Sequence, residues 1–354
     1  MAKINIAASV TLSLLIVGPA KMTLVDVNWR YQGLQVVHLE NELISIDVLP
    51  ELGAKIYNFV HRPSDRNLLW HNPRIPPARQ HLGARFDDVW SGGWDELIPN
   101  DIPTRVIGNE MLPDHGEVWS QPSEWEVVKS DGSNAAVRFV NYGHVLPTIF
   151  EKTIMLRPGD SFCTVQYRLT NSGRRSIDFL WNIHPAMAIS PTTRLDVPAR
   201  RGIVEKWGTD HLEGGSEYDW PYAVDRSGQR VDLRKVHPPE SALADHHYLP
   251  EVSEGWYAVT DTQAQVGFGL LFPTSVFPHL WLFRTFGGWR GLYTLILEAS
   301  NGHSSDLSIA RQSGHCGHLD PGQTIEAEVK AIAYSGHAAV GRINPDGTVI
   351  DGKP

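Results

Sequence analysis

The sequence predicts an all-β protein built as a large antiparallel β-sandwich with little helix. From residue 34 onward, apolar and polar residues alternate with a period of two rather than 3.6, which is typical of half-buried strands. Turn-forming segments separate these runs, and the chain contains 24 Pro and 31 Gly, which fits frequent chain reversal. Many short strands with regular turn signals between them favour a sandwich.

The predicted strands are rich in β-branched and aromatic residues, and they end at turn segments such as Pro50–Gly53 and Arg157–Asp160. In chain order the clearest are Leu34–His38, Leu43–Leu49, Ala136–Tyr142, Thr153–Leu156, Cys163–Leu169, Ala258–Asp261, Val266–Phe272, Tyr293–Leu297 and Thr324–Tyr334. Helix is expected to be minor, with Ala242–Tyr248 forming at most one or two turns.

We expect one domain from 23 to 340, because no linker-like change in composition and no repeat divides the chain, and an exposed C-terminal tail at 341–354. Residues 1–22 resemble either a signal peptide, with Lys3 before the apolar run Ile4–Val17, or an over-long start ahead of Met22. The second interpretation predicts a cytoplasmic protein, and the first a periplasmic or secreted one. The apolar run is too short for a comfortable membrane span, so no membrane partner is expected.

Charge and cysteine content exclude several classes of function. The 354 residues carry a formal net charge of -9, and no Lys/Arg run could follow a phosphate backbone, so nucleic acid is not expected as a partner. Cys163 and Cys316 cannot make a disulfide scaffold or a four-thiolate metal site. We favour two inert thiols over one long-range bridge.

Aromatic content points towards a carbohydrate ligand. The chain has 12 Trp, and several lie in loops flanked by Gly or Pro. Any one of them is better explained by packing between sheets, but together they suit the apolar face and hydroxyl rim of a sugar. These loop residues are Trp90, Trp94, Trp119, Trp220 and Trp289.

The long segments Arg74–Pro113 and Ala199–Val252 lack a strand pattern, and such loops in a compact β domain usually carry function. No nucleophile elbow, phosphate-binding loop or dinucleotide fingerprint occurs in the chain. The histidines in Asp245-His246-His247 and those at 315 and 318 lack metal-ligand spacing, so we expect surface histidines and no metal.

Two polar residues end otherwise apolar strands. His184 closes the aromatic run that begins at Phe179, and Glu298 closes the apolar run Leu292–Leu297. A lone histidine in such a place is more often a satisfied core residue, whereas a carboxylate there is costly to bury unless it is exposed or used. Two loop segments, Ser91–Asn100 and Leu112–Glu117, add further polar candidates.

The order and wording of these segments resemble the aldose 1-epimerase family, from residue 34 to about 335. The resemblance rests on Asn41-Glu42-Leu43 with Val48–Ala54, Gly92-Gly93-Trp94 with Pro99-Asn100, His115-Gly116-Glu117 with Trp125-Glu126-Val127, Glu151–Asn171, Gly291–Glu298 and Leu319–Gly322. It implies the galactose mutarotase-like supersandwich, a small-molecule sugar substrate, no cofactor, and a monomer or homodimer.

The resemblance also implies site residues. Glu298 would be the base on the anomeric hydroxyl and His184 the acid on the ring oxygen, with His115 donating to the same oxygen or a developing oxyanion. The remaining substrate-binding residues would be Trp94 as a stacking platform, together with Arg85, Glu96, Asn100 and Glu117. Asp95 or Asp245 would orient the sugar.

The sequence departs from the family at both catalytic positions. Ala299-Ser300 follows Glu298 where the family commonly has proline, and Pro185-Ala186 follows His184 where the better-studied mutarotases have an aromatic pair. These departures keep open a non-catalytic carbohydrate-binding protein on the same scaffold. A lyase or hydrolase would need a second carboxylate beside Glu298, for which Glu96, Glu117 and Asp95 are the candidates.

Overall fold

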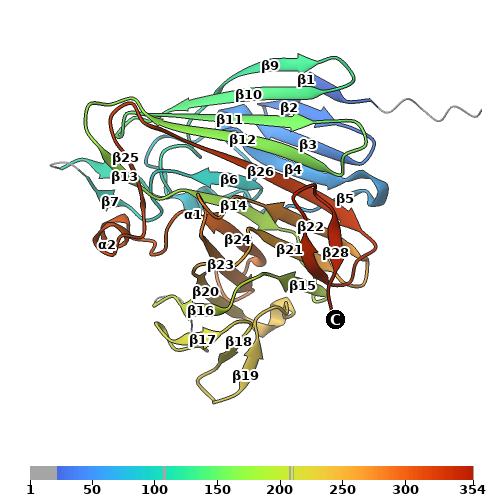
Figure 1. Cartoon of the computed structure of the whole chain (residues 1–354), viewed down its shortest axis with the longest axis vertical. Helices are drawn as coiled ribbons and strands as arrows, with labels where there is room; N and C mark the ends of the chain where they lie inside the picture. The colour runs from blue at the N-terminus through green and yellow to red at the C-terminus, as the bar shows by residue number, and fades with distance from the viewer. Residues whose placement is uncertain (1–21, 107–108, 207–208, 210, 354) are drawn as a thin grey trace, which may run out of the picture.

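The computed structural model describes residues 22–106, 109–206, 209 and 211–353. Two large antiparallel sheets, of 12 and eight strands, pack face to face (Figure 1). Among the described residues, helix is confined to two α-helices and three 3-10 turns. The predicted all-β sandwich with little helix is confirmed.

The 12-stranded sheet runs in the order β1-β2-β3-β4-β6-β14-β24-β23-β20-β16-β17, with β5 paired to β4. Its strands are β1 (Leu24–Tyr31), β2 (Leu34–Glu40), β3 (Ile44–Leu49), β4 (Lys55–His61), β5 (Arg66–Asn67), β6 (Trp94–Leu97), β14 (Asn182–Met187), β16 (Arg201–Val204), β17 (Glu217–Asp219), β20 (Leu243–Leu249), β23 (His279–Phe286) and β24 (Tyr293–Ser300).

The eight-stranded sheet runs β15-β21-β22-β26-β12-β11-β10-β9. Its strands are β9 (Glu124–Ser130), β10 (Ala135–Tyr142), β11 (Thr148–Leu156), β12 (Phe162–Asn171), β15 (Thr193–Asp196), β21 (Trp256–Asp261), β22 (Val266–Leu271) and β26 (Thr324–Ser335).

The remaining elements are short. Four two-stranded ribbons are formed by β7 (Thr104–Arg105) with β8 (Met111–Leu112), β13 (Ile177–Phe179) with β25 (Gly317–Leu319), β18 (Tyr222–Val224) with β19 (Arg230–Asp232), and β27 (Val340–Ile343) with β28 (Val349–Asp351). The helical elements are α1 (Phe86–Val89), α2 (Leu307–Gln312), η1 (Pro50–Leu52), η2 (Arg62–Ser64) and η3 (Pro239–Ser241).

The two sheets bury their facing side chains in one large core. Strand β11 shows the expected alternation, since every second residue from Thr148 to Leu156 is buried and the residues between are half-buried. Strands β14 and β24 differ, because β14 is buried throughout and β24 nearly so. These two strands are neighbours in the middle of the 12-stranded sheet and are covered on both faces, so their burial does not alternate.

Three predictions about local structure are wrong. Ala242–Tyr248 is not helical, because β20 (Leu243–Leu249) pairs with β23 over its whole length. The long segment from 199 to 252 contains β16 to β20 rather than irregular loop only. The expected C-terminal tail forms the β27–β28 hairpin, which buries Val340 and Ile343 against Trp256 and Tyr334. In each case pairing and packing with distant residues decide the local structure.

Three further points concern the cysteines, membrane-spanning helices and the N-terminal segment. Cys163 and Cys316 are both free, as favoured from their spacing. No helix within the described ranges is long and apolar enough to cross a membrane. The proposed signal peptide or over-long start falls, except for Met22, outside the described residues.

A buried ion pair joins the two sheets. Lys152 on β11 and Glu96 on β6 have side chains only 1% and 0% exposed, and Lys152 Nζ lies 2.9 Å from Glu96 Oε2. Tyr167 donates a hydrogen bond of 2.7 Å to the same carboxylate, and Lys152 also donates to the carbonyl of Ala54. The pair is costly to bury, but each of its polar groups has a partner.

Because the charges are buried, removing one partner should cost far more than breaking a surface pair. We expect Lys152→Met to reduce the free energy of unfolding by about 3–5 kcal/mol, measured by urea denaturation. Arg168→Met provides the matched control, because Arg168 pairs with Glu326 on the surface and should contribute less than about 1 kcal/mol. Equal losses in the two variants would contradict the role assigned to the buried pair.

Candidate active site

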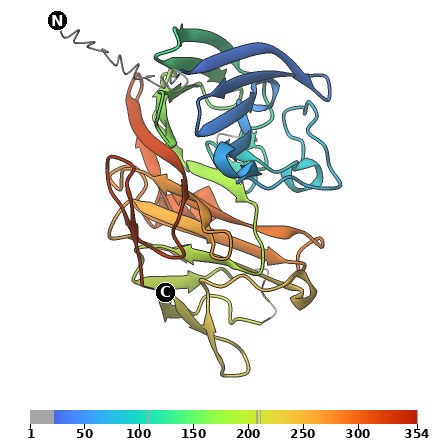
Figure 2. The same cartoon turned by 90° about the vertical axis from the view of Figure 1, so that its right-hand side faces the viewer.

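The cavity on the outer face of the 12-stranded sheet contains polar residues of its central strands, where His184 and Glu298 lie within β14 and β24 rather than at their ends. It lies over β14, β20, β23 and β24, and loops between residues 84 and 115 cover it; Figure 2 shows these cyan loops gathered at one side of the molecule. Its volume is about 170 Å³. The lining residues are Phe86, Asp87, Trp90, Asp101, Ile102, Asp114, His115, His184, His246, Trp281, Phe283, Trp289, Ile296 and Glu298.

Strand alternation directs His184 into this cavity. Its neighbour Ile183 packs in the core between the sheets, so His184 points to the opposite, outer face. The imidazole is 4% exposed and meets the rings of Phe86 and Trp90 edge-on at 5.5 and 5.9 Å. Burial, reinforced by the positive charge of His115, holds the pKa of His184 well below its usual value. His184 is therefore neutral, and its Nδ1 has no hydrogen-bond partner among the described residues.

Glu298 reaches the same cavity from β24. Leu297 and Ala299 on either side face the core between the sheets, and Glu298 points outward with 4% exposure. Burial and the nearby carboxylate of Asp101 raise the pKa of Glu298 well above its usual value, while the positive charge of His115 opposes the shift. Its Oε2 atom has no hydrogen-bond partner among the described residues. A carboxylate in this setting takes up a proton more readily than one in water.

His115 enters the cavity from the loop after β8, where two carboxylates hold it. Its Nδ1 lies 2.9 Å from Asp114 Oδ1, and its Nε2 lies 3.6 Å from Asp101 Oδ1. The ring stacks on Phe86 at 4.1 Å with an interplanar angle of 6°. Burial disfavours the charged form, but the carboxylates of Asp101, Asp114 and Asp87 outweigh it and raise the pKa of His115 to about 9. His115 is therefore an imidazolium at neutral pH.

The backbone around His115 explains why glycine follows it. His115 and Gly116 both have positive φ, 58° and 80°. A Cβ on residue 116 would lie 2.1 Å from the carbonyl oxygen of Ile98, so only glycine fits there. Gly92 has the same role in the Gly-Gly-Trp loop, where a Cβ would lie 2.2 Å from the carbonyl oxygen of Trp70. The glycines allow these loops to lie close against the sheet.

The structure thus brings His115, His184 and Glu298, which are far apart in sequence, into one cavity. The two histidine rings are 6.3 Å apart between centroids and perpendicular. The imidazole of His115 is protonated, that of His184 is neutral, and the carboxylate of Glu298 has a raised pKa. This combination supplies a proton donor and a proton acceptor within a space of monosaccharide size.

Aromatic side chains form the apolar wall of the cavity. Of the five loop tryptophans, Trp90 and Trp289 line it, and Trp119 packs behind them against Phe86. Trp90 Nε1 is buried without a hydrogen-bond partner in the described parts of the chain, so it can donate to a ligand. Trp281, on β23, also lines the cavity and was not identified from the sequence.

Trp94 and Glu96 do not reach the cavity. The Trp94 side chain is fully buried between the sheets and meets Phe268 edge-on at 6.2 Å, so it cannot stack on a ligand. Glu96 also points inward, to its ion pair with Lys152. The prediction that these residues bind substrate is corrected to a structural role in the core.

Asn100, Glu117 and Arg85 also lie outside the cavity lining. Asn100 donates to the carbonyl oxygens of Ile102 and Pro113, and so fixes the loop that carries Asp101. The Glu117 carboxylate accepts three backbone N–H groups from residues 144 to 146. The Arg85 side chain is 72% exposed and lies 3.5 Å from Asp88. The prediction that these three residues bind substrate is therefore not supported by their positions.

The two aspartates considered for orienting a sugar are also held elsewhere. Asp95 pairs with Lys55 at 2.9 Å, and Asp245 pairs with Arg284 at 2.6 Å, both in buried positions. The cavity carboxylates are instead Asp87, Asp101 and Asp114. Asp87 and Asp101 lie in the segment Arg74–Pro113, which was expected to carry function, and Asp114 lies in the candidate segment Leu112–Glu117 beside His115.

His246 is a further residue that sequence reasoning misplaced. It was expected at the surface, but it is 5% exposed and lines the cavity from β20. His247 points to the opposite face, where Nε2 lies 2.9 Å from Asp245 Oδ1. The adjacent histidines do lie on opposite faces, as the strand pattern requires, and both faces are covered. Within the described ranges, no three His, Cys, Asp or Glu residues are grouped to hold a metal ion.

No family model and no curated protein sequence matches the chain. Solved structures do. A Klebsiella pneumoniae protein provisionally named an aldose 1-epimerase aligns at TM-score 0.69 and 14% identity, covering 87% of this chain and 82% of that one. A galactose mutarotase-like protein from Lactobacillus casei aligns at TM-score 0.61 and 16% identity, covering 84% and 100%. The Slr1438 protein from Synechocystis sp. aligns at TM-score 0.65 and 16% identity, covering 88% and 99%.

These likenesses define the class of protein to which the architecture corresponds. The chain has the galactose mutarotase-like fold, as the resemblance in its sequence implied. At 14% and 16% identity the similarity shows the fold alone. The chemistry of the site must be argued from the cavity itself.

The two tryptophan positions can be separated by experiment. We expect Trp94→Ala to reduce the free energy of unfolding by about 3–5 kcal/mol, because it empties a large volume between the sheets. Trp289→Ala, at the partly exposed rim of the cavity, should cost clearly less. Urea denaturation of both variants tests this, and a Trp94→Ala variant as stable as the parent would show that the core does not depend on this ring.

Proposed function

We propose that this protein interconverts the α and β anomers of an aldose by acid–base opening and reclosure of the sugar ring. The observation that carries the proposal is that two buried polar atoms and a charged proton donor lie in the same cavity. Glu298 Oε2 and His184 Nδ1 are buried without protein partners in the described ranges, and the His115 imidazolium lines the same small cavity. Buried polar atoms of this kind are expensive unless a ligand completes their hydrogen bonds.

Ring opening needs a base on the anomeric hydroxyl and an acid on the ring oxygen. In the proposed step, the Glu298 carboxylate removes the hydroxyl proton while the His115 imidazolium protonates the ring oxygen. The bond from the anomeric carbon to the ring oxygen breaks, and an open-chain aldehyde forms. After the carbonyl group rotates, the steps reverse: Glu298 returns its proton to the carbonyl oxygen, and His115 recovers its proton from the attacking hydroxyl.

The roles of the two histidines differ from those the sequence suggested. The resemblance made His184 the acid, but burial keeps His184 neutral, whereas two carboxylates keep His115 charged. We therefore assign the acid role to His115. His184 then acts as a neutral hydrogen-bonding group that orients a sugar hydroxyl. The aromatic wall of Trp90 and Trp289 supplies contacts to the apolar face of the ring.

The competing functions fare differently. The second carboxylates expected for a glycosidase or lyase, Glu96, Glu117 and Asp95, do not line the cavity, and Asp101 and Asp114, which do, lie beside His115. A non-catalytic sugar-binding protein would use the same cavity, and the departures after His184 and Glu298 favour it. The two remaining proposals are separated by whether Glu298 transfers a proton.

Replacing Glu298 tests the base directly. Glu298→Gln keeps the shape of the side chain but removes its ability to take a proton, so anomer exchange should fall by about 10²–10⁴-fold while sugar binding persists. The exchange rate is measured by NMR across a panel of aldoses, and binding by tryptophan fluorescence. Glu326→Gln on β26 is the matched control, because this exposed glutamate lies outside the cavity. Exchange at the parent rate in Glu298→Gln would favour the non-catalytic protein.

The pH dependence of kcat/KM tests the donor. Activity requires His115 protonated, so it should fall as pH rises through about 9, the pKa of His115. It also requires Glu298 ionised, so it should fall on the acid side at a pH above the usual glutamate range.

Two carboxamide variants should shift these limits differently. Asp101 raises the pKa of both groups, so Asp101→Asn should move both limits to lower pH. Of the acid and the base, Asp114 raises the pKa of His115 and is not among the causes of the shift of Glu298, so Asp114→Asn should lower only the alkaline limit. If Asp114→Asn left the alkaline limit in place, His115 would not be the acid.

A further inference from the structure

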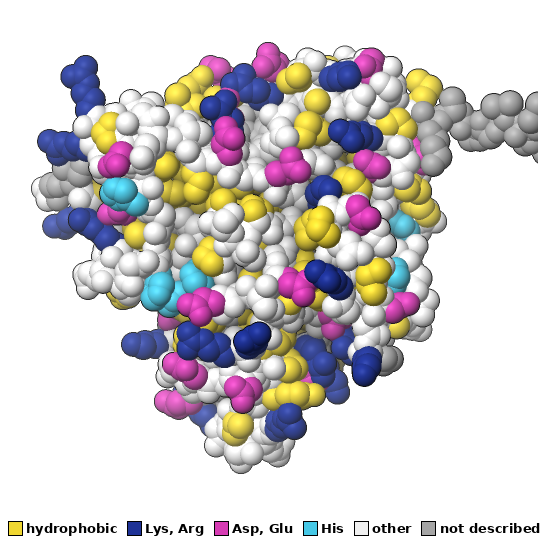
Figure 3. Space-filling view, viewed as in Figure 1, with side chains coloured by type: hydrophobic (Ala, Val, Ile, Leu, Met, Phe, Trp, Pro, Cys, Tyr) yellow, Lys and Arg dark blue, Asp and Glu magenta, His cyan; other side chains and the backbone are white. Residues whose placement is uncertain are grey.

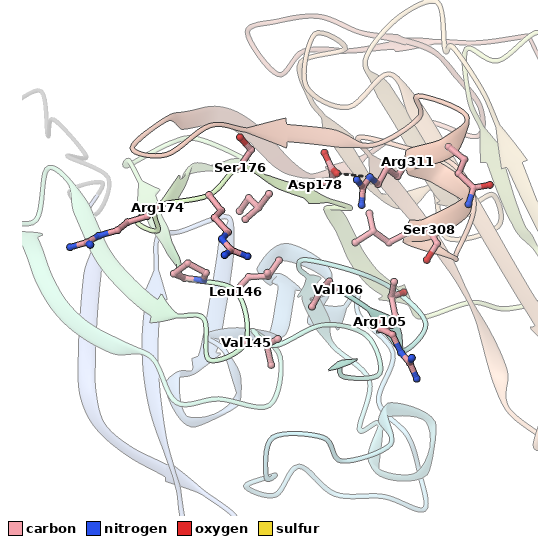
Figure 4. A pocket seen from close by; sticks show the side chains of 15 residues that line it. Arg105, Val106, Val145, Leu146, Arg174, Ser176, Asp178, Ser308 and Arg311 are labelled. Carbon is pink, nitrogen blue, oxygen red and sulfur yellow. Dashed lines mark ion pairs between the residues drawn. The ribbon is translucent and has the colours of Figure 1, made fainter. Parts of the chain in front are cut away.

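A second and larger cavity lies at the end of the sandwich that carries β7, β13 and α2. It has a volume of about 820 Å³ and shares no lining residue with the sugar cavity. Figure 4 shows side chains from four separate segments around it: residues 104–106, the loop from 145 to 147, the turn from 174 to 178 that enters β13, and α2. We refer to this cavity as the arginine cleft.

Buried polar side chains fix two walls of the arginine cleft. Glu117, which is 2% exposed, accepts hydrogen bonds from the N–H groups of His144, Val145 and Leu146 at 2.8, 2.6 and 3.2 Å. Asn171, which is fully buried, donates to the carbonyl of Arg175 at 2.8 Å. These contacts hold the backbone of both walls without any ligand.

A further contact ties the two walls together. Ser172 donates from both its backbone N–H and its hydroxyl to the carbonyl oxygen of Pro147, each at 2.8 Å. The cleft is therefore built into the fold rather than left between loose loops, and little ordering is needed on binding.

Four arginines line the cleft, in a chain whose formal net charge is -9. Arg311 pairs with Asp178 at 3.0 Å. Arg105, Arg174 and Arg175 form no ion pair and donate no side-chain hydrogen bond to the parts of the chain that the structure describes. Lys and Arg side chains gather along this edge, at the left of Figure 3, while Figure 4 shows Arg174 directed away from the other labelled side chains. Arg105 and Arg175, both exposed, are therefore cleft-lining cations that pair with no described residue.

Besides the arginines, six apolar and four neutral polar residues line the cleft, and Asp178 is the single carboxylate among the described lining residues. The apolar residues are Val106, Val145, Leu146, Pro147, Ile177 and Leu307, and the neutral polar ones are Thr104, Ser176, Ser308 and Gln312. Unpaired guanidinium groups around an apolar floor suit a ligand with an anionic group and a less polar body. Arginine matches phosphate and carboxylate geometry with paired N–H donors.

We propose that the arginine cleft binds a small organic phosphate ester. A phosphate monoester carries up to two negative charges and three acceptor oxygens, so it can accept from guanidiniums that reach it from different segments. A volume of about 820 Å³ falls in the range of small-molecule sites rather than of extended protein interfaces. The ester's organic part would lie on the apolar floor.

The cleft also adjoins the sugar cavity through one short segment. Asp101 and Ile102 line the sugar cavity, and residues 104–106 line the arginine cleft. The backbone N–H of Ile102 donates to the carbonyl of Ser305, just ahead of α2. The two cavities are neighbours but share no lining residue. The proposed phosphate site therefore does not depend on the proposed mutarotase activity.

Isothermal titration calorimetry of the full chain tests the proposal, with AMP, glucose 6-phosphate, inorganic phosphate and sulfate as probes. We expect at least one ester to bind with one molecule per chain and more tightly than either inorganic ion. Arg105→Gln and Arg175→Gln should each weaken ester binding about tenfold or more, since each removes charge-assisted hydrogen bonds. Arg30→Gln on β1, at the far edge of the molecule, makes the same charge change as a control and should leave affinity within about twofold.

Four results would overturn the proposal. Absence of binding by any ester at millimolar concentration would remove it, and so would equal binding of the esters and the inorganic ions. Ester binding that survives both arginine changes but is lost in His115→Gln would place the phosphate in the sugar cavity. An acidic peptide that binds where no ester does would show a protein-docking surface instead. Glu298→Gln should leave ester affinity unchanged, so failure of the mutarotase proposal is distinguishable from failure of this one.

Discussion

The covering of β14 and β24 on both faces is the constraint on which the rest of the structure depends. These neighbouring strands sit in the middle of the larger sheet, with the core between the sheets on one side and the aromatic loops on the other. His184 and Glu298 point to the outer side, so the loops remove them from water. Among the described residues, no hydrogen-bond partner of Glu298 Oε2 or His184 Nδ1 offsets the resulting desolvation. The fold tolerates this cost because the surrounding apolar burial is large.

Desolvation alone would make every titratable group in the cavity neutral. It raises the pKa of Glu298 and lowers that of His184, which leaves no charged donor. The two carboxylates beside His115 provide the exception, because their charge outweighs burial and keeps this imidazole protonated. Groups with opposed protonation states can therefore coexist within one small volume, which is the condition for paired acid–base chemistry.

Many of the remaining buried polar residues serve architecture. Lys152 with Glu96 joins the two sheets, and Arg284 with Asp245 is buried on β23 and β20. Glu117 and Asn171 hold loop backbones through N–H and C=O groups that would otherwise be unsatisfied. The Glu117 contact also fixes one wall of the arginine cleft, so a residue that looked like part of the sugar site instead supports a different cavity.

The sequence by itself determined the class of fold and the most informative site residues. Strand alternation and turn residues are local signals, and they sufficed for the sandwich and for most of its long strands. A polar residue at the end of an apolar strand is also a local signal, and it identified His184 and Glu298. His115 was identified only through the resemblance of His115-Gly116-Glu117 to the family's His-Gly segment.

Only the tertiary structure decided which face each side chain occupies and what it meets there. Trp94 and Glu96 lie in the candidate segment Ser91–Asn100. On β6, however, their side chains point into the core, towards Phe268 and Lys152. His246 lines the cavity because β20 lies beside β23 and is covered, which its local sequence does not reveal. The charge of His115 depends on Asp101, which a separate loop brings near. Burial and charge are set by neighbours distant in sequence, so local patterns predict which residues are polar and ordered but not their environments.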